Sequence, residues 1–214
     1  MEYTTIGELT LDGGCVVFDF TNTIGSRKEE RLRDYLKTYP DFLLWVNRQG
    51  LLPQSRFNAL SKLAKQEPEK GNIAFQKIVE TREVLYALFS PLALNENPKK
   101  ETVDKFNKLL QESFSYISID IGNTKNEINF ADVTLSYLEP LHIILKSAFD
   151  VLTQEEMARI KECPSCGWLF LDKTKNKKRR WCNMLDCGSK DKASRYYHRK
   201  KAALNNESST SAKG

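Results

Sequence analysis

The sequence predicts a mainly α-helical protein: a helical N-terminal domain with a small β-hairpin, followed by a small four-cysteine module with a C-terminal basic helix. Three observations predict this fold class. Apolar residues recur at helical spacing over most of the first 155 residues, one short stretch alternates in strand fashion, and four of the five cysteines fall within residues 163–187. A chain of 214 residues with 40% hydrophobic and 29% charged residues has room for one medium domain and one small module.

The beginning of the chain predicts short elements. Residues 1–14 predict an entry strand and a turn that ends in Asp12-Gly13-Gly14. The run 15–23 (CVVFDFTNT) predicts either a buried strand or the first turns of a helix, because periodicity cannot separate the two in so short a segment.

Helical periodicity then dominates. It predicts helices over residues 32–48, 55–65, 71–90, 101–113 and 139–152. Pro40 lies inside the first of these, so we expect two helices or a break there. Alternation over 114–120 and 127–131, with Gly122 between them, predicts a hairpin. Residues 153–160 predict a continuation of the last helix or a short linking helix.

Four cysteines form the most specific motif of the chain. Cys163, Cys166, Cys182 and Cys187 follow the pattern C-x2-C-x15-C-x4-C. Two residues between cysteines let one turn present both thiolates to a single ion, and Gly167 permits the sharp turn. Thiolates also accept iron–sulfur clusters, but a closed four-ligand set in a small module favours one structural Zn²⁺ ion. We therefore expect a zinc-finger module with four cysteine ligands.

Positive charge is concentrated in this module. Residues 173–201 hold twelve Lys or Arg and two Asp, a net charge of +10, so the rest of the chain carries −5. A basic helix is predicted from Ser189 to Leu204, with Tyr196 and Tyr197 inside it. We expect the basic surface to bind nucleic acid, DNA in preference to RNA, although most charge runs are simply solvated. The candidate contacts are Lys175, Lys177, Lys178, Arg179, Arg180, Lys190, Lys192, Arg195 and Arg199.

Polar side chains also interrupt apolar sequence near the N-terminus. Because buried polar groups need partners, they serve either the structure or a small-molecule pocket. An ion pair of Asp19 with Arg27 or Arg82 is one expected arrangement. The candidate ligand-binding residues are Asp19, Asn22, Thr23, Arg27 and Arg82.

Both ends of the chain resemble known families. The segments that resemble a CGNR-type zinc finger are WLFLD (168–172), Asn176, RRWCNM (179–184) and Cys187-Gly188. The segment FDFTNT (18–23), with Arg27 after it, resembles the opening motif of the ABATE domain, which usually precedes that finger. The resemblance implies a bacterial, stress-induced transcription regulator whose finger contacts DNA and whose N-terminal domain senses a ligand.

One departure concerns the motif that gives the finger its name. The family's Cys-Gly-Asn-Arg is Cys187-Gly188-Ser189-Lys190 in this chain. Serine can cap a following helix as asparagine does, and lysine can meet a phosphate. Lysine lacks the planar fork that arginine offers to a guanine edge, so phosphate binding is better supported here than base recognition.

We expect three parts: an ABATE-like domain for ligand sensing or dimerisation (1–155), a CGNR-like finger (156–204) and a disordered tail (205–214), which is polar and small. A homodimer would enlarge the small footprint of one finger. An RNA- or ribosome-associated module is the alternative function. We expect no enzyme, because no nucleophile elbow, phosphate-binding glycine loop or second metal motif is present. The absence of a signal peptide and of an apolar membrane-spanning run predicts a cytoplasmic protein that has no membrane partner.

Overall fold

The computed structural model describes residues 5–122, 127–130 and 135–210. Helices dominate it, which confirms the mainly α fold class. The α-helices are α1 (Val16–Thr21), α2 (Tyr39–Arg48), α3 (Gln54–Gln66), α4 (Pro68–Ala93), α5 (Lys100–Phe114), α6 (Glu139–Gln154) and α7 (Ser189–Thr210). Two antiparallel hairpins accompany them, β1 (Ile117–Asp120) with β2 (Glu127–Phe130), and β3 (Ile160–Glu162) with β4 (Leu169–Leu171).

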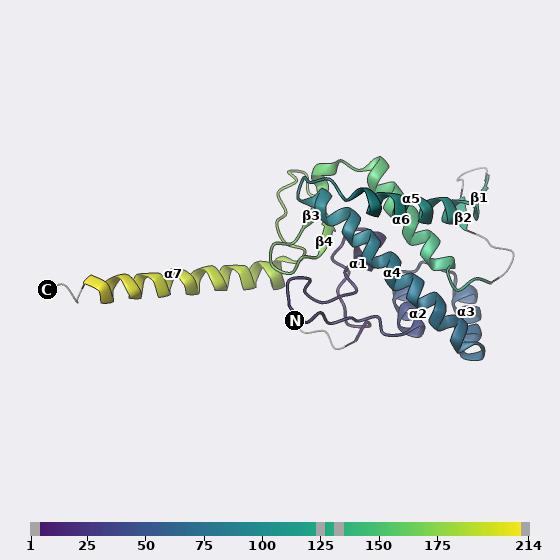
Figure 1. Ribbon diagram of the computed structural model, residues 1–214, viewed down its shortest axis with the longest axis horizontal. Coiled ribbons are helices and arrows are strands. Elements are labelled where there is room, and N and C mark those ends of the chain that lie inside the picture. The colour runs from purple at the N-terminus through teal and green to yellow at the C-terminus, as the bar shows by residue number, and fades with distance from the viewer. Residues whose placement is uncertain (1–4, 123–126, 131–134, 211–214) are drawn as a thin grey trace.

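The long helix α4 organises the body of the molecule. It lies against α1, α2, α3, α5 and both strands of the second hairpin. The first hairpin lies at one end of the body, whereas α7 projects away from the other end (Figure 1). No helix in the described ranges combines the length and the apolarity that crossing a membrane requires.

The hydrophobic core is centred on α1. Phe18 and Phe20 are fully buried, and their rings meet Phe89 of α4 and Trp45 of α2 at centroid distances of 5.0 and 5.5 Å. The same buried cluster continues into β4, where Phe170 is also fully buried. The first half of the four-cysteine module therefore shares its core with the helical domain.

The N-terminal prediction was half right. Residues 9–12 have no regular structure in place of the expected entry strand, a bend follows at 13–15 where the turn was expected, and of the two structures considered for 15–23 the helix forms. Gly13 explains the bend, because its N–H donates to the Asp19 carboxylate over 2.8 Å. A Cβ at Gly13 would lie 2.6 Å from the Asp19 backbone nitrogen, so only glycine fits this close approach.

The helix expected from residue 32 is wrong. Helix α2 begins at Tyr39, where Thr38 and Asp41 form a capping box and Pro40 occupies the first turn. The second of the two helices expected around Pro40 is therefore confirmed as α2, with Asp41 in its first turn, whereas the first does not form. The preceding residues are extended and bond to the segment after α1, with Tyr35 N–H donating to Thr23 O over 3.0 Å.

The other predicted helices and the first hairpin are confirmed; Ala131 of that prediction lies outside the described residues. The helix or linking helix predicted over 153–160 is reduced to a 3-10 turn, Met157–Arg159, followed by the unpredicted strand β3. Helix α7 is longer than the predicted 189–204. The three-part division of the chain and the disorder over 205–214 stay predictions, and residues 211–214 lie outside the described ranges.

Candidate metal centre and nucleic-acid interface

The four predicted cysteines converge on one point. The sulfur atoms of Cys163, Cys166, Cys182 and Cys187 all lie within 4.8 Å of one another. Cys182 Sγ is 3.5 Å from Cys166 Sγ and 3.7 Å from Cys187 Sγ. A tetrahedron with metal–sulfur bonds of about 2.3 Å has sulfur–sulfur edges of about 3.8 Å, so these separations fit one ion.

The first cysteine pair lies on the turn between β3 and β4. Gly167 adopts φ +76°, and its N–H donates to Cys163 O over 2.8 Å. Cys163 N–H in turn donates to Trp168 O over 2.8 Å, which closes the hairpin. An added Cβ at Gly167 would lie 2.9 Å from the Cβ of Arg27. The glycine is thus needed both for the turn and for the contact with the helical domain.

The second pair is held by a capped π-helical turn, Met184–Gly188. The Asn183 side chain accepts hydrogen bonds from Leu185 N–H and Asp186 N–H, at 2.9 and 3.2 Å. This cap places Cys187 back toward Cys182. Helix α7 begins two residues after Cys187, so the metal site fixes the base of that helix.

The chemistry of the cluster suits zinc. Three of its members are buried, and each cysteine offers one sulfur atom to a shared point. A closed set of four thiolates is a structural site with no open position for catalysis. The four cysteines can therefore hold one zinc ion.

Cys15 stands apart from this cluster. It is the N-cap residue of α1, and burial raises the pKa of its thiol to about 12. A protonated, partly buried thiol that packs against the core acts as a small apolar side chain.

The loop between the cysteine pairs is built around Asp172. Its buried carboxylate accepts from Thr174 N–H, Thr174 Oγ1 and Arg179 N–H, at 3.0, 2.6 and 2.9 Å. Burial raises the pKa of Asp172, but these hydrogen bonds outweigh burial and lower it overall.

Not every basic residue of this loop is available for nucleic acid. Arg179 donates to the carbonyls of Cys182 and Trp181 and lies over the Phe170 ring at 4.7 Å, so it holds the finger together. Lys177 forms an ion pair with Glu156. Three others are exposed on the loop: Lys175, Lys178 and Arg180.

Helix α7 carries the remaining candidates on two different sides. At 100° per residue, Lys192, Arg195 and Arg199 fall within about 60° of one another, whereas Lys190 lies roughly opposite. All four are exposed, and ion pairs within one helical turn join Arg195 to Asp191 (3.0 Å) and Lys190 to Asp186 (3.1 Å). The residue that replaces the signature arginine is thus not on the main cationic face.

The five candidate ligand-binding residues lie close together but are engaged in structure. Asn22 pairs with the backbone of Leu169 in β4. Asp19 accepts from Gly13 N–H, and burial raises its pKa to about 6. The ion pairs expected between Asp19 and either arginine are wrong, because both arginines have other acidic partners.

Those partners are Asp34 and Glu83. Arg82 is 1% exposed and makes two hydrogen bonds to the Asp34 carboxylate, at 2.8 and 2.6 Å, with Thr23 Oγ1 at 3.1 Å. Arg27 pairs with Glu83 at 2.6 Å and lies 3.9 Å from the centroid of the Tyr86 ring. A small-molecule site at these residues stays a prediction that these contacts do not favour.

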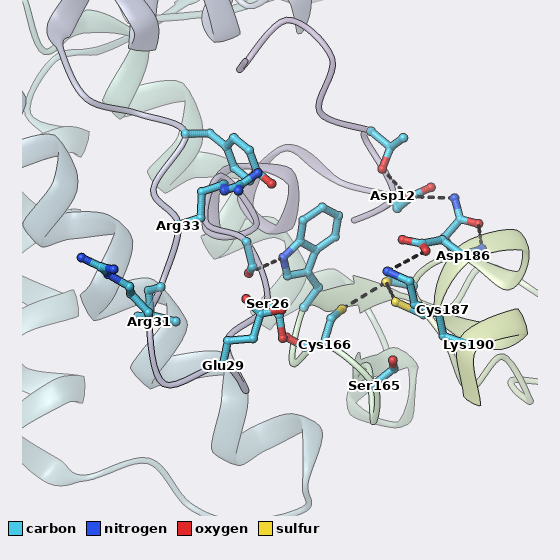
Figure 2. A pocket seen from close by; sticks show the side chains of 17 residues that line it. Asp12, Ser26, Glu29, Arg31, Arg33, Ser165, Cys166, Asp186, Cys187 and Lys190 are labelled. Carbon is cyan, nitrogen blue, oxygen red and sulfur yellow. Dashed lines mark hydrogen bonds and ion pairs between the residues drawn. The ribbon is translucent and has the colours of Figure 1, made fainter. Parts of the chain in front are cut away.

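A different cavity lies where residues 25–35 face the finger, and we call it the junction cleft. It has a volume of about 590 Å³. Figure 2 shows Arg31 and Arg33 on one side of it, and Asp12, Asp186 and Lys190 on the other. Sequence reasoning missed it because its walls are far apart in the chain. Its one local signal is that seven of the eight residues 27–34 are charged.

Together, the helical body and the four-cysteine cluster define a zinc-finger protein with an N-terminal helical domain. Residues 159–200 match the family model described as "CGNR zinc finger", and residues 14–155 match the ABATE model, described as "Putative stress-induced transcription regulator". The chain belongs to the ABATE family and carries a CGNR zinc finger at its C-terminal end. No match was found among curated proteins.

Proposed function

We propose that the protein is a zinc-dependent, DNA-binding transcription regulator whose finger contacts DNA and whose N-terminal domain senses a ligand. The observation that carries this proposal is helix α7, which begins two residues after Cys187 and projects away from the body (Figure 1). The family descriptions point to regulation in place of catalysis, and we propose no enzymatic activity.

The shape of α7 suits a groove of duplex DNA. Its 22 residues give a length of about 33 Å, and the major groove, about 12 Å wide, admits one α-helix. The exposed face of Lys192, Arg195 and Arg199 can follow a phosphate backbone. Lys175, Lys178 and Arg180 extend the positive charge onto the loop at the base of the helix.

The experiment compares two triple variants for binding to duplex DNA of random sequence. Lys192→Ala, Arg195→Ala and Arg199→Ala together remove the α7 face. Lys37→Ala, Lys62→Ala and Lys105→Ala remove the same charge from exposed positions elsewhere. We expect the α7 variant to lose at least about tenfold in affinity and the control to keep most of it. Equal losses, or affinity that survives zinc chelation, would contradict the proposal.

An RNA-associated role is the second candidate, favoured by one observation. Tyr196 and Tyr197 on α7 are 63% and 62% exposed, and exposed aromatic rings can stack on unpaired bases. Direct competition between duplex DNA and structured RNA separates the two functions. Preference for RNA that is lost in Tyr196→Ala would replace DNA with RNA as the partner.

A further inference from the structure

The junction cleft has the size of a small-molecule site. Its volume of about 590 Å³ lies within the range of roughly 300–1,000 Å³ that is typical of ligand pockets. It is not the site predicted from sequence, whose polar residues are engaged in the core. Nothing in the family descriptions assigns a role to this cavity.

The two walls of the cleft differ in charge. The wall formed by residues 25–35 contributes Arg31, Arg33 and Glu29, which sum to +1. The opposite wall contributes Asp12, Asp186 and Lys190, which sum to −1. Four thiolates around one Zn²⁺ ion add two further negative charges on that side, because Cys166, Cys182 and Cys187 also line the cleft.

The positive wall contains a guanidinium group, that of Arg31, whose N–H donors can bind a ligand. Arg31 is exposed, and among the residues that the structure describes it has no hydrogen bond or ion pair. Lys190 differs, because its ammonium group lies 3.1 Å from Asp186 Oδ1 and is balanced within its own wall. A guanidinium group such as that of Arg31 can bind a carboxylate through two parallel hydrogen bonds.

Apolar and aromatic side chains also line the cleft. Leu32, Tyr35 and Trp168 line the cleft, and the indole N–H of Trp168 already donates to Ile24 O and Gly25 O at 2.8 and 3.0 Å. The Trp168 ring therefore offers the ligand an apolar contact and no further donor. This combination suits a short carbon skeleton that carries opposite charges.

We propose that the junction cleft binds a zwitterionic small molecule of the amino-acid class. Its carboxylate pairs with Arg31, with Arg33 beside it, and its ammonium group faces Asp12, the acidic side chain of the opposite wall that Lys190 does not balance. A ligand with only one charge would satisfy one wall and be repelled by the other. The ligand also touches the segment that starts α7, because Cys187 and Lys190 lie on either side of Ser189.

This inference names the chemical class of the ligand that the proposed regulator would sense. Binding at the cleft does not depend on the proposed function, but a regulatory role for the bound ligand rests on it. Binding at the cleft is measured without DNA, so the two proposals can fail separately. A chain that binds an amino acid but no nucleic acid would refute the proposed function alone.

The test is a set of ¹⁵N–¹H NMR titrations of the full-length, zinc-loaded protein. The twenty common amino acids are added singly, to about 10 mM, which detects dissociation constants in the millimolar range. Each amino acid that binds is compared with its amine and acid analogues, which keep one charge each. Arg31→Ala removes the proposed carboxylate contact, and Lys37→Ala removes a charge from an exposed position outside the cleft.

We expect at least one amino acid to give saturable shifts confined to residues 10–12, 25–35, 163–168 and 182–190. Both analogues and Arg31→Ala should weaken its binding by at least about tenfold, and Lys37→Ala should not. Amide dispersion equal to that of the parent protein checks that Arg31→Ala is folded. The proposal is overturned if no amino acid gives saturable shifts, if a singly charged analogue binds equally well, or if the shifts map to residues 173–180 or 192–200.

Discussion

The side-chain amide of Asn22 pairs with the backbone of Leu169 as a neighbouring strand would. Asn22 Nδ2 donates to Leu169 O over 2.8 Å, and Leu169 N–H donates to Asn22 Oδ1 over 3.0 Å. Both groups are buried, and 147 positions separate the two residues. This pairing joins the end of α1 to the edge of β4, so the finger is anchored to the helical domain by an amide within the family's N-terminal motif.

Asn22→Ala is expected to destabilise the whole protein. It leaves a buried N–H and a buried carbonyl of Leu169 unpaired, which costs about 2–4 kcal/mol. Urea unfolding of the zinc-loaded protein measures the change. Asn107→Ala, at an exposed position of α5, serves as the control and should change the unfolding free energy by less than about 0.5 kcal/mol. A loss confined to the finger, with the helical body unaffected, would contradict a shared core.

Asp34→Ala should destabilise the protein by about 2–3 kcal/mol, because the fully buried Arg82 then loses the carboxylate that accepts two of its hydrogen bonds. Glu83 remains 2.9 Å from Arg82 Nε and limits the loss. The matched control is Asp104→Ala, which removes an exposed pair with Lys100 and should cost less than about 0.5 kcal/mol. Thermal or urea unfolding measures both variants, and equal effects would refute the buried pair.

The buried Asp19 should make stability pH-dependent. Burial raises its folded-state pKa to about 6 from the usual 3.8, so the native state holds a proton that the unfolded chain has released. Stability from this group is complete below about pH 4 and is lost as the pH rises through 6. In Asp19→Asn this loss is absent, so the variant should gain about 1 kcal/mol relative to the parent between pH 5 and pH 7.

Urea titrations of the parent and of Asp19→Asn at pH 5 and pH 7 measure that difference. Any release of zinc at the lower pH affects both proteins alike and cancels in the comparison. Asp104→Asn, at an exposed carboxylate, should show no such change. A difference between parent and Asp19→Asn that is the same at pH 5 and pH 7 would contradict the raised pKa.

Cys187→Ala should abolish stoichiometric zinc binding, because three remaining thiolates leave the closed shell incomplete. Native mass spectrometry measures the metal content. NMR should show the loss of the dispersed amides of residues 182–190, while far-UV circular dichroism retains most of the helical signal of the body. Cys15→Ala, which removes the thiol outside the cluster, should keep one zinc ion per chain. Retention of zinc by Cys187→Ala would remove Cys187 from the ligand set.

These elements differ in how far the sequence could predict them. The metal site was predictable because the spacing of four cysteines is a local pattern, and α3 to α6 were predictable because their apolar residues keep a helical period. The strands β3 and β4 are three residues long, and the run Trp168–Leu171 is apolar on both faces, so no alternation marks it. The segment 32–38 carries apolar residues at helical spacing but does not form a helix. Its backbone bonds instead to residues 23–25, which follow α1 and are distant in sequence.

The partners of the candidate side chains could not be predicted from the sequence. Sequence could identify Arg27, Arg82 and Arg179 as functional candidates, but their partners lie elsewhere in the chain and only the fold brings them together. The junction cleft is the converse case, since its walls come from residues 25–35 and from the finger. Arg31 belongs to no motif of the sequence, and only the fold places it across one cavity from Lys190.

The signature position of the finger should contribute less to DNA binding than the cationic face of α7. Lys190 lies roughly opposite Arg199 around the helix and is paired with Asp186, whereas Arg199 is exposed on the face shared with Lys192. Arg199→Ala should therefore reduce the slope of log affinity against log salt by about 1, the effect of losing one phosphate contact, and Lys190→Ala should leave the slope nearly unchanged. Fluorescence anisotropy with labelled duplex DNA over a range of salt concentrations measures both slopes.

Lys190→Arg separates the remaining alternative, because an arginine that reached a guanine edge would raise affinity for particular sequences without changing the slope for random DNA. If Lys190→Ala lowers the slope as much as Arg199→Ala does, Lys190 contacts phosphate directly, and the side of α7 that faces the junction cleft also lies against DNA.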